Sequence, residues 1–247
     1  MALLKKKSYE RYDAGTNSVI IFVLNLYQMV LKLAKGFNYS KLKEYKLYNI
    51  MKAVAIPVCK VRVKYQFEGL ENVPEKGGFI MAANHISIFD PVLIGIALKK
   101  RPIHYMGKEE LFENPLLGKF LTHMDAFPIK RGTGDMSSIE YAEKIVKNGW
   151  ILGVFPEGTR SKDFKPQRPK SGIALIAKQT NADVLPVSIY TADDYKRGTM
   201  VTIRFGKLIK NEEFGFTENV KSKELRSAAT KVMDEIVKLW EEGHCKK

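Results

Sequence analysis

Beyond residue 60, hydrophobic and polar positions follow the spacings of strands and helices in alternation. Residues 61–67 alternate apolar and polar side chains, which is typical of a half-buried strand, and residues 79–83 form a short apolar run typical of a buried strand. The same reasoning predicts further strands at 103–106, 126–129, 150–155, 184–190 and 200–205, and helices at 91–98, 114–121, 137–147, 172–178 and from Ser222, the expected N-cap, to about residue 240. This order predicts an α/β domain over residues 61–247, with a central mixed sheet flanked by helices.

Residues 1–60 have a different pattern. Two apolar runs, at 19–33 and 47–58, flank a lysine-rich segment. The first run, as a helix of about 15 residues at ~1.5 Å each, would be roughly 22 Å long, short of a ~30 Å hydrocarbon core. No small-residue cleavage site follows it, which argues against a signal peptide. We expect a two-helix appendage that lies in the membrane interface; the alternative is that both helices cover a soluble core.

Charge supports the interfacial interpretation. The chain has 41 Lys and Arg against 27 Asp and Glu, a net charge of +14, and residues 1–60 carry eleven of these cations and three of the acids. Such a balance implies an acidic partner, and no nucleic-acid-binding signature accompanies it, so an anionic membrane surface is the expected partner. The 45% hydrophobic content excludes disorder. Two distant cysteines exclude a disulfide scaffold and a cysteine zinc site, and they favour a reducing compartment.

Candidate chemistry begins directly after the buried strand at 79–83. The loop there contains His85 and Asp90. On a regular helix these residues would point about 140° apart, so they meet only if the chain bends between strand and helix. An imidazole held by a carboxylate is suited to act as a general base. Two structural alternatives remain: Asp90 as the N-cap of a helix with Pro91 at its first position, and a capping box formed by Ser87 and Asp90.

Two further strand ends offer groups that bind phosphate. Residues 155–161 read Phe-Pro-Glu-Gly-Thr-Arg-Ser, where Gly158 permits close approach of the backbone and Arg160 can form a bidentate contact. Lys130 and Arg131 follow the strand predicted at 126–129. Each segment alone is equally well explained as an ordinary basic loop. One base and several cations at three strand ends together point to a site for a phosphorylated substrate.

The spacing of these motifs, together with Gly-Leu-Glu-Asn-Val-Pro at 69–74 and Val-Leu-Pro-Val-Ser-Ile at 184–189, resembles the glycerolipid acyltransferase family, and specifically its 1-acylglycerol-3-phosphate acyltransferase branch. The likeness covers residues 69–190, about half of the chain. It implies transfer of a fatty acyl group from an acyl thioester, of coenzyme A or acyl carrier protein, to the sn-2 hydroxyl of lysophosphatidic acid, which forms phosphatidic acid.

The resemblance also implies roles for individual residues. His85 would take the hydroxyl proton in a direct transfer without an acyl-enzyme, and Asp90 would hold its imidazole. The acceptor phosphate and its pocket would involve Arg131, Arg160, Lys130, Lys108, Glu157, Gly158 and Thr159, with Asn84 and Pro186 as structural residues near the site. No metal or cofactor is implied. An enzyme with lipid substrates is expected at the cytoplasmic face of the cell membrane, as a monotopic or peripheral protein.

Other functions remain open at this point. The acceptor could instead be glycerol 3-phosphate or another lysophospholipid, and the same base could activate water in a hydrolase. A membrane-bound phospholipid-binding module without catalysis is a different class of function, which an intact His85 and Asp90 pair disfavours.

Overall fold

The computed structural model describes residues 37–40, 42, 56–57, 59–98, 101–130, 135–192 and 195–244. The first helix predicted for the membrane interface and nearly all of the second lie outside these residues. Within the described ranges, no helix combines the length and the apolar character needed to cross a membrane.

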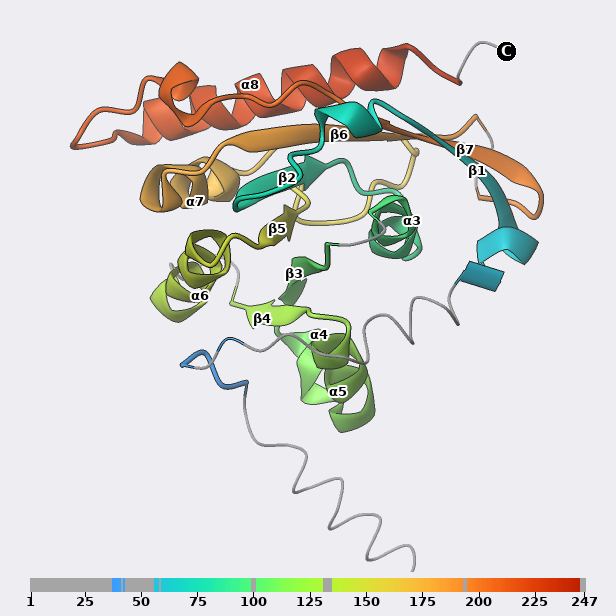
Figure 1. Ribbon diagram of the computed structural model, residues 1–247, viewed down its shortest axis with the longest axis horizontal. Coiled ribbons are helices and arrows are strands. Elements are labelled where there is room, and N and C mark those ends of the chain that lie inside the picture. Colours follow the sequence, from blue (N-terminus) through green and yellow to red (C-terminus); the bar gives the residue numbers. More distant parts are fainter. Residues whose placement is uncertain are drawn as a thin grey trace, which may run out of the picture.

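The described chain forms a seven-stranded sheet in the order β1-β7-β6-β2-β5-β3-β4 (Figure 1). Its strands are β1 Val63–Glu68, β2 Phe79–Ala83, β3 Ile103–Lys108, β4 Phe127–Ile129, β5 Ile151–Val154, β6 Val184–Tyr190 and β7 Thr199–Phe205. Strands β2 to β6 run parallel, whereas β7 is antiparallel to β6 and pairs in parallel with β1. The predicted mixed sheet is therefore confirmed.

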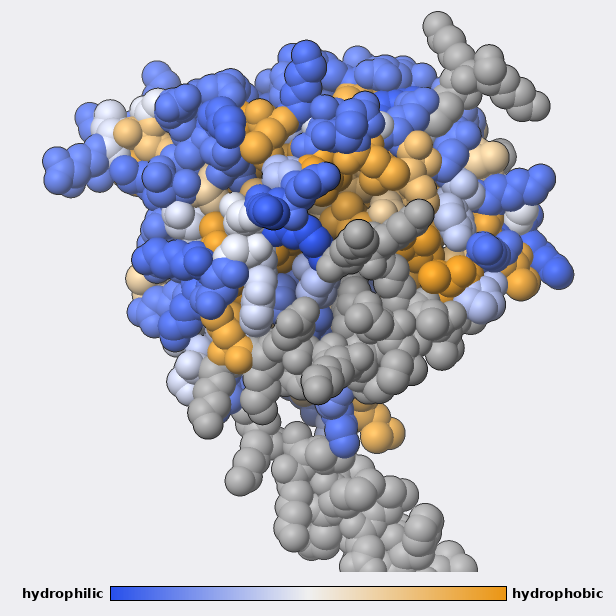
Figure 2. Space-filling view, in the orientation of Figure 1, coloured by the Kyte–Doolittle hydropathy of each residue, from blue (hydrophilic) through white to orange (hydrophobic). Residues whose placement is uncertain are grey.

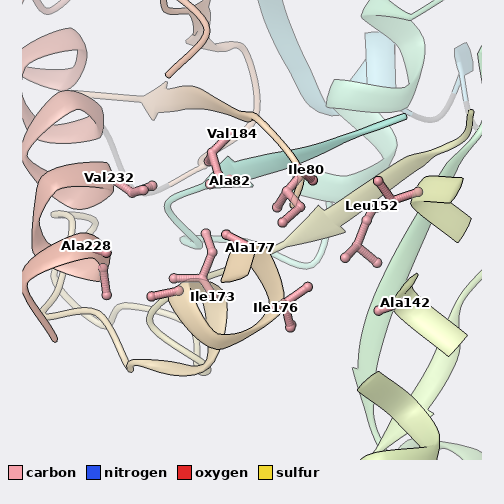
Figure 3. Close-up of a cluster of buried hydrophobic side chains, with 14 of the residues drawn as sticks. Ile80, Ala82, Ala142, Leu152, Ile173, Ile176, Ala177, Val184, Ala228 and Val232 are labelled. Atoms are coloured by element: carbon pink, nitrogen blue, oxygen red, sulfur yellow. The ribbon is translucent and has the colours of Figure 1, made fainter. Parts of the chain in front are cut away.

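Helices cover both faces of this sheet (Figure 1). They are α3 Asp90–Ala97, α4 Glu110–Glu113, α5 Pro115–His123, α6 Met136–Lys147, α7 Gly172–Thr180 and α8 Ser222–Glu241, with 3-10 turns η1 Leu70–Asn72 and η2 Asn211–Phe214. One face packs on α6, α7 and α8, and Figure 3 shows Ile80 and Ala82 of β2 in this core with Val232 of α8. The alternate residues of β2, Phe79 and Met81, join the second core with α3.

Local capping explains where the sequence prediction misplaced element ends. The predicted N-cap Ser222 is wrong by one position: Lys221 is extended and precedes the helix, and Glu224 reaches back to accept its N–H at 3.2 Å. The helix predicted at 114–121 is α5, which Asn114 caps through its side chain, and the short α4 before it was not predicted. Residues 59–62 are helical, so β1 begins at Val63 rather than at residue 61.

The parallel strands give the sheet one functional edge. Strands β2, β3, β4, β5 and β6 all point the same way, so the loops that leave their carboxyl ends emerge on one side of the sheet. Ligand sites of open α/β sheets form at this edge. The segments that the sequence singles out for catalysis or phosphate binding, at 84–90, 108, 130 and 155–161, lie at this edge.

Candidate active site

The first part of the site is the loop that joins β2 to α3. β2 ends at Ala83 in the core, and α3 begins at Asp90 with Pro91 in its first turn, where the fixed φ of proline suits a helix. The chain bends between the two elements instead of continuing as helix. As a result, His85 Nδ1 lies 2.8 Å from Asp90 Oδ2. The structure thus brings together the imidazole and the carboxylate that the sequence marks as a possible base.

Asp90 is a fully buried carboxylate surrounded by donors. Its Oδ2 accepts the N–H groups of Ile86 and Ser87, each at 2.7 Å, in addition to the ring of His85. Its Oδ1 accepts the hydroxyl of Tyr195 at 2.8 Å. A buried charge is costly unless it is hydrogen-bonded. Four donors on two oxygens provide that compensation and fix the plane of the carboxylate.

The two helix-start alternatives are partly right. Phe89 precedes the helix and Asp90 is its first residue, so the placement of Asp90 at the N-cap and Pro91 at the first position is wrong by one residue. Half of the capping box is present, because Ser87 donates its N–H to Asp90, while its hydroxyl accepts the N–H of Phe89 at 3.3 Å. The same carboxylate therefore shapes the turn and holds the imidazole.

His85 is fixed from three sides. Its backbone N–H donates to Glu157 Oε1 at 3.2 Å, and its carbonyl accepts the N–H of Ser161 at 2.7 Å. The imidazole stacks on Phe155, with ring centroids 4.0 Å apart. The side chain is 18% exposed, so solvent can reach it. Because Nδ1 faces Asp90, Nε2 is the nitrogen left to accept a proton.

Glu157 connects the second motif to the first. Its carboxylate is buried, and Oε2 has no hydrogen-bond partner in the described part of the chain. Burial raises the pKa of Glu157 to about 7, although the backbone N–H groups of His85 and Gln167 act in the opposite direction. This carboxyl is therefore close to half ionised at neutral pH. Its Oε1 contacts the loop that carries the imidazole through the N–H of His85.

The rest of the second motif presents cations at the surface. Gly158 has a φ of +70°, and a Cβ at this position would lie 3.1 Å from the side chain of Lys170. Thr159 and Arg160 are exposed, and Arg160 makes neither a hydrogen bond nor an ion pair with any described residue. Lys170 is anchored by its own N–H, which donates to Pro156 at 2.9 Å. A glycine at 158 thus leaves space for the side chain of Lys170 against the loop that carries Arg160.

Two other predicted phosphate ligands, Lys108 and Lys130, form ion pairs with glutamates. Lys108 pairs with Glu110 at 2.8 Å, and Lys130 pairs with Glu109 at 3.5 Å. Both pairs are exposed, and exposed pairs contribute only about 0–1 kcal/mol. Either lysine can therefore exchange its glutamate for a phosphate at little cost. Arg131 lies outside the described residues.

Asn84 and Pro186 hold the sheet beneath the site. Asn84 is buried, donates to the carbonyl of Ile189 at 2.9 Å and accepts the N–H of the same residue at 2.7 Å. It therefore ties the loop that carries His85 to β6. Pro186 lies inside β6 opposite Ala82, and its carbonyl accepts the N–H of Gly206 at 2.8 Å.

Other reactive side chains belong to the core. Cys59 is buried, and burial raises the pKa of its thiol, which disfavours a nucleophilic thiolate. His104 is buried against Trp150, and burial lowers its pKa to about 4, so it is neutral at physiological pH. Across the described ranges, no group of three or more His, Cys, Asp or Glu side chains is placed to hold a metal ion.

Two residues at the site were missed by the sequence analysis. Lys170 follows the second motif within a run of cations at 162–170, and that run was a readable signal. Tyr195 comes 105 residues after Asp90, in the loop between β6 and β7, and no motif surrounds it. Only the fold reveals its contact with the carboxylate.

Comparison with known proteins identifies the family. The family model for acyltransferases matches residues 64–190, which include both the His85–Asp90 loop and the 155–161 segment. This chain belongs to the acyltransferase family. The prediction made from the motifs is confirmed.

Relatives of this acyltransferase are similar over most of their length. It is 33% identical to the 1-acyl-sn-glycerol-3-phosphate acyltransferase of Bacillus subtilis, over 68% of this chain and 83% of that protein. It is 29% identical to the enzyme of the same name from Streptococcus pneumoniae, over 76% and 71% of the two chains. The crystal structure of the 1-acyl-sn-glycerophosphate (LPA) acyltransferase PlsC from Thermotoga maritima superposes with a TM-score of 0.62 at 26% identity, covering 82% of this chain and 81% of that one.

Proposed function

We propose that this acyltransferase transfers a fatty acyl group from an acyl thioester, of coenzyme A or acyl carrier protein, to the sn-2 hydroxyl of 1-acylglycerol 3-phosphate and so forms phosphatidic acid. The names of its relatives from Bacillus subtilis, Streptococcus pneumoniae and Thermotoga maritima support this substrate. The observation that carries the proposal is the 2.8 Å contact between His85 Nδ1 and Asp90 Oδ2 at the functional edge of the sheet.

The proposed reaction is a direct transfer. Asp90 holds the proton of His85 on Nδ1, so Nε2 takes the proton of the acceptor hydroxyl as its oxygen attacks the thioester carbonyl. The tetrahedral intermediate collapses, the carbon–sulfur bond breaks, and the imidazolium returns its proton to the departing thiolate. The buried thiol of Cys59 takes no part, which is consistent with a mechanism without an acyl-enzyme.

Recognition of the acceptor phosphate is assigned to the second motif. Arg160 is exposed and has no competing carboxylate among the described residues, and the side chain of Lys170 lies against Gly158 of the same segment. Lys108 and Lys130 would add charge after leaving their glutamates, and Arg131 and Thr159 would complete the pocket. Arginine can bind two phosphate oxygens at once. Glu157 would hold this loop at a fixed position relative to His85, because its carboxylate accepts the backbone N–H of His85.

Membrane contact is proposed for residues 1–60 and, in the described part, for an α4–α5 apolar face. This face comprises Leu111, Leu116, Leu117 and Phe120, all exposed, with Leu116 68% exposed. Figure 2 shows hydrophobic side chains at the surface there, at the lower end of the described body. Lys119 adds a cation, and α4 starts directly after the carboxyl end of β3. Such a face beside the site would hold the enzyme against an anionic bilayer, at the cytoplasmic surface of the cell membrane.

The test is release of thiol from a long-chain acyl thioester by purified protein in detergent. The acceptors are lysophosphatidic acid and, separately, glycerol 3-phosphate; the variants are His85→Ala and His123→Ala. His123 lies at the end of α5, where its ring contacts Lys119 rather than Asp90, so it is a matched histidine control. We expect release that requires lysophosphatidic acid, is lost in His85→Ala and persists in His123→Ala.

The alternatives give different results in the same assay. Release with glycerol 3-phosphate alone would keep the chemistry and change the acceptor. Release without any acceptor would indicate a hydrolase. Equal release by His85→Ala and the wild type would exclude the proposed base, and no release by the folded wild type would favour a phospholipid-binding module.

A further inference from the structure

Tyr195 is buried and contacts Asp90 through Oδ1, the carboxylate oxygen that does not face His85. It belongs to the loop between β6 and β7, and it is buried with a φ of +50°. A positive φ is unusual for a bulky residue and requires the surrounding structure to hold it. Its ring stacks on Phe89 with centroids 6.5 Å apart, and its hydroxyl donates to Asp90 Oδ1 at 2.8 Å. The strained backbone and the ring contact both serve to aim this hydroxyl at the carboxylate.

The two oxygens of Asp90 have different partners. Oδ2 accepts from His85 and from two backbone N–H groups of its own loop, whereas Oδ1 accepts from Tyr195, which a distant loop supplies. We propose that Tyr195 is a positioning residue: its hydroxyl fixes the carboxylate of Asp90 so that Oδ2 faces His85, and it shares the negative charge that supports the imidazolium during acyl transfer. This inference rests on the proposed function.

The chemistry of the neighbourhood keeps Tyr195 a donor. Burial, and then the charge of Asp90, raise the pKa of Tyr195 well above its ordinary value, so the hydroxyl retains its proton. The other ionisable groups around this contact are His85 on Asp90, the thiol of Cys59 beside Tyr195, and Glu157 near Asp90. None of these offers Oδ1 a replacement hydrogen bond in the described structure.

Removing the hydroxyl has two expected consequences. Oδ1 would be left in the core without a donor, so the carboxylate would rotate more freely and Oδ2 would face the imidazole less often. Whenever Oδ2 does face the ring, the charge on Asp90 would be less dispersed, so it would attract an imidazolium at position 85 more strongly, and we expect this effect to set the direction of the pH shift. The base would then be occupied by a proton at higher pH than in the wild type.

The experiment compares Tyr195→Phe with Tyr190→Phe, a matched removal of a tyrosine hydroxyl from β6. The full chain in detergent is assayed by thiol release with acyl-coenzyme A and lysophosphatidic acid across the pH range of activity. For Tyr195→Phe we expect kcat to fall roughly tenfold, less than the 10²–10⁴ that a general base contributes, because the base itself remains. KM for both substrates stays unchanged, and the acidic limb of the kcat profile moves to higher pH.

A second variant and a second readout distinguish positioning from folding and from the failure of the proposed function. A 3-fluorotyrosine at position 195 keeps the shape and strengthens the donor, so the acidic limb should move to lower pH. Proton NMR follows the His85 Nδ1–H, identified as the downfield resonance absent from His85→Ala; it should shift in Tyr195→Phe and not in Tyr190→Phe. If the wild type is inactive toward lysophosphatidic acid but the resonance still shifts in Tyr195→Phe, the proposed function is overturned, while the positioning of Asp90 and His85 by Tyr195 is retained. An active wild type with kcat, acidic limb and resonance all unchanged in Tyr195→Phe would overturn the inference alone.

Discussion

Glu157 gives the sharpest test of the electrostatics at this site. Its carboxyl is buried, one oxygen accepts the N–H of His85, and the other has no partner among the described residues. The substitution Glu157→Gln keeps the carbonyl oxygen that accepts this N–H but removes the ionisation. The comparison therefore isolates the cost of the buried negative charge.

The magnitude follows from the pKa. Between its ordinary value of 4.5 and about 7, the unfolded chain has released this proton while the folded protein still holds it. The free energy of unfolding therefore falls as the pH rises through this window. For a change from roughly pH 5.5 to pH 8, the two pKa values give a loss of about 2 kcal/mol from this carboxyl alone. Glu157→Gln lacks that loss.

The assay is urea unfolding followed by tryptophan fluorescence at both pH values. His104 contributes with the opposite sign, because its pKa is lowered from 6.5 to about 4 and neutral histidine favours the folded state as the pH rises. Its contribution is the same in both proteins and cancels in the difference. We expect the variant to gain about 2 kcal/mol relative to the wild type on going to the higher pH. The same difference at both pH values would show that Glu157 ionises normally and would refute the reasoning.

Three further predictions test other contacts. Asn84→Ala leaves both backbone groups of Ile189 without partners and should lower the unfolding free energy by about 2–4 kcal/mol in urea, whereas the exposed Asn148→Ala should change it little. Gly158→Ala and Gly77→Ala both place a side chain at positive φ and should each cost about 1 kcal/mol, but only Gly158→Ala, which meets Lys170, should raise KM for lysophosphatidic acid in the thiol assay. Leu116→Ser with Phe120→Ser should weaken co-sedimentation with phosphatidylglycerol-containing vesicles about tenfold or more. Leu70→Ser, which makes the same leucine-to-serine change at an exposed position outside the α4–α5 apolar face, should not weaken it.

Much of the fold was predictable because its signals are local. Strands buried on both faces read as apolar runs, and β6 was placed with its observed bounds, Val184–Tyr190. The misplaced ends have side-chain causes. Glu224 accepts the N–H of Lys221 and moves the start of α8, and Asn114 starts α5 with its side chain after a short helix that has no apolar period of its own.

The site was predictable only where its residues lie close in sequence. His85 and Asp90 share one loop, so their spacing could indicate a pair, but the bend that joins them depends on the order of β2 and α3. Glu157 could be singled out by its motif, yet its bond to the backbone of His85 follows from β2 lying beside β5. Tyr195 has no local signal, because its contact depends on the antiparallel β6–β7 connection that returns the chain over the carboxyl edge.

Asp90 illustrates why a structural and a catalytic interpretation of one residue need not compete. Its Oδ2 accepts two backbone N–H groups that form the turn, and it accepts the imidazole at the same time. A carboxylate that already orders the turn is held in place before the substrate arrives, so little reorganisation is needed when the imidazolium forms. For the same reason, loss of activity on substitution of Asp90 would combine a disturbed turn with a disturbed base. Tyr195 binds Oδ1 and, in the described structure, makes no hydrogen bond to the turn, and Nε2 of His85 is likewise outside the turn. Substitutions at these two residues therefore separate the effect on the base from the effect on the turn.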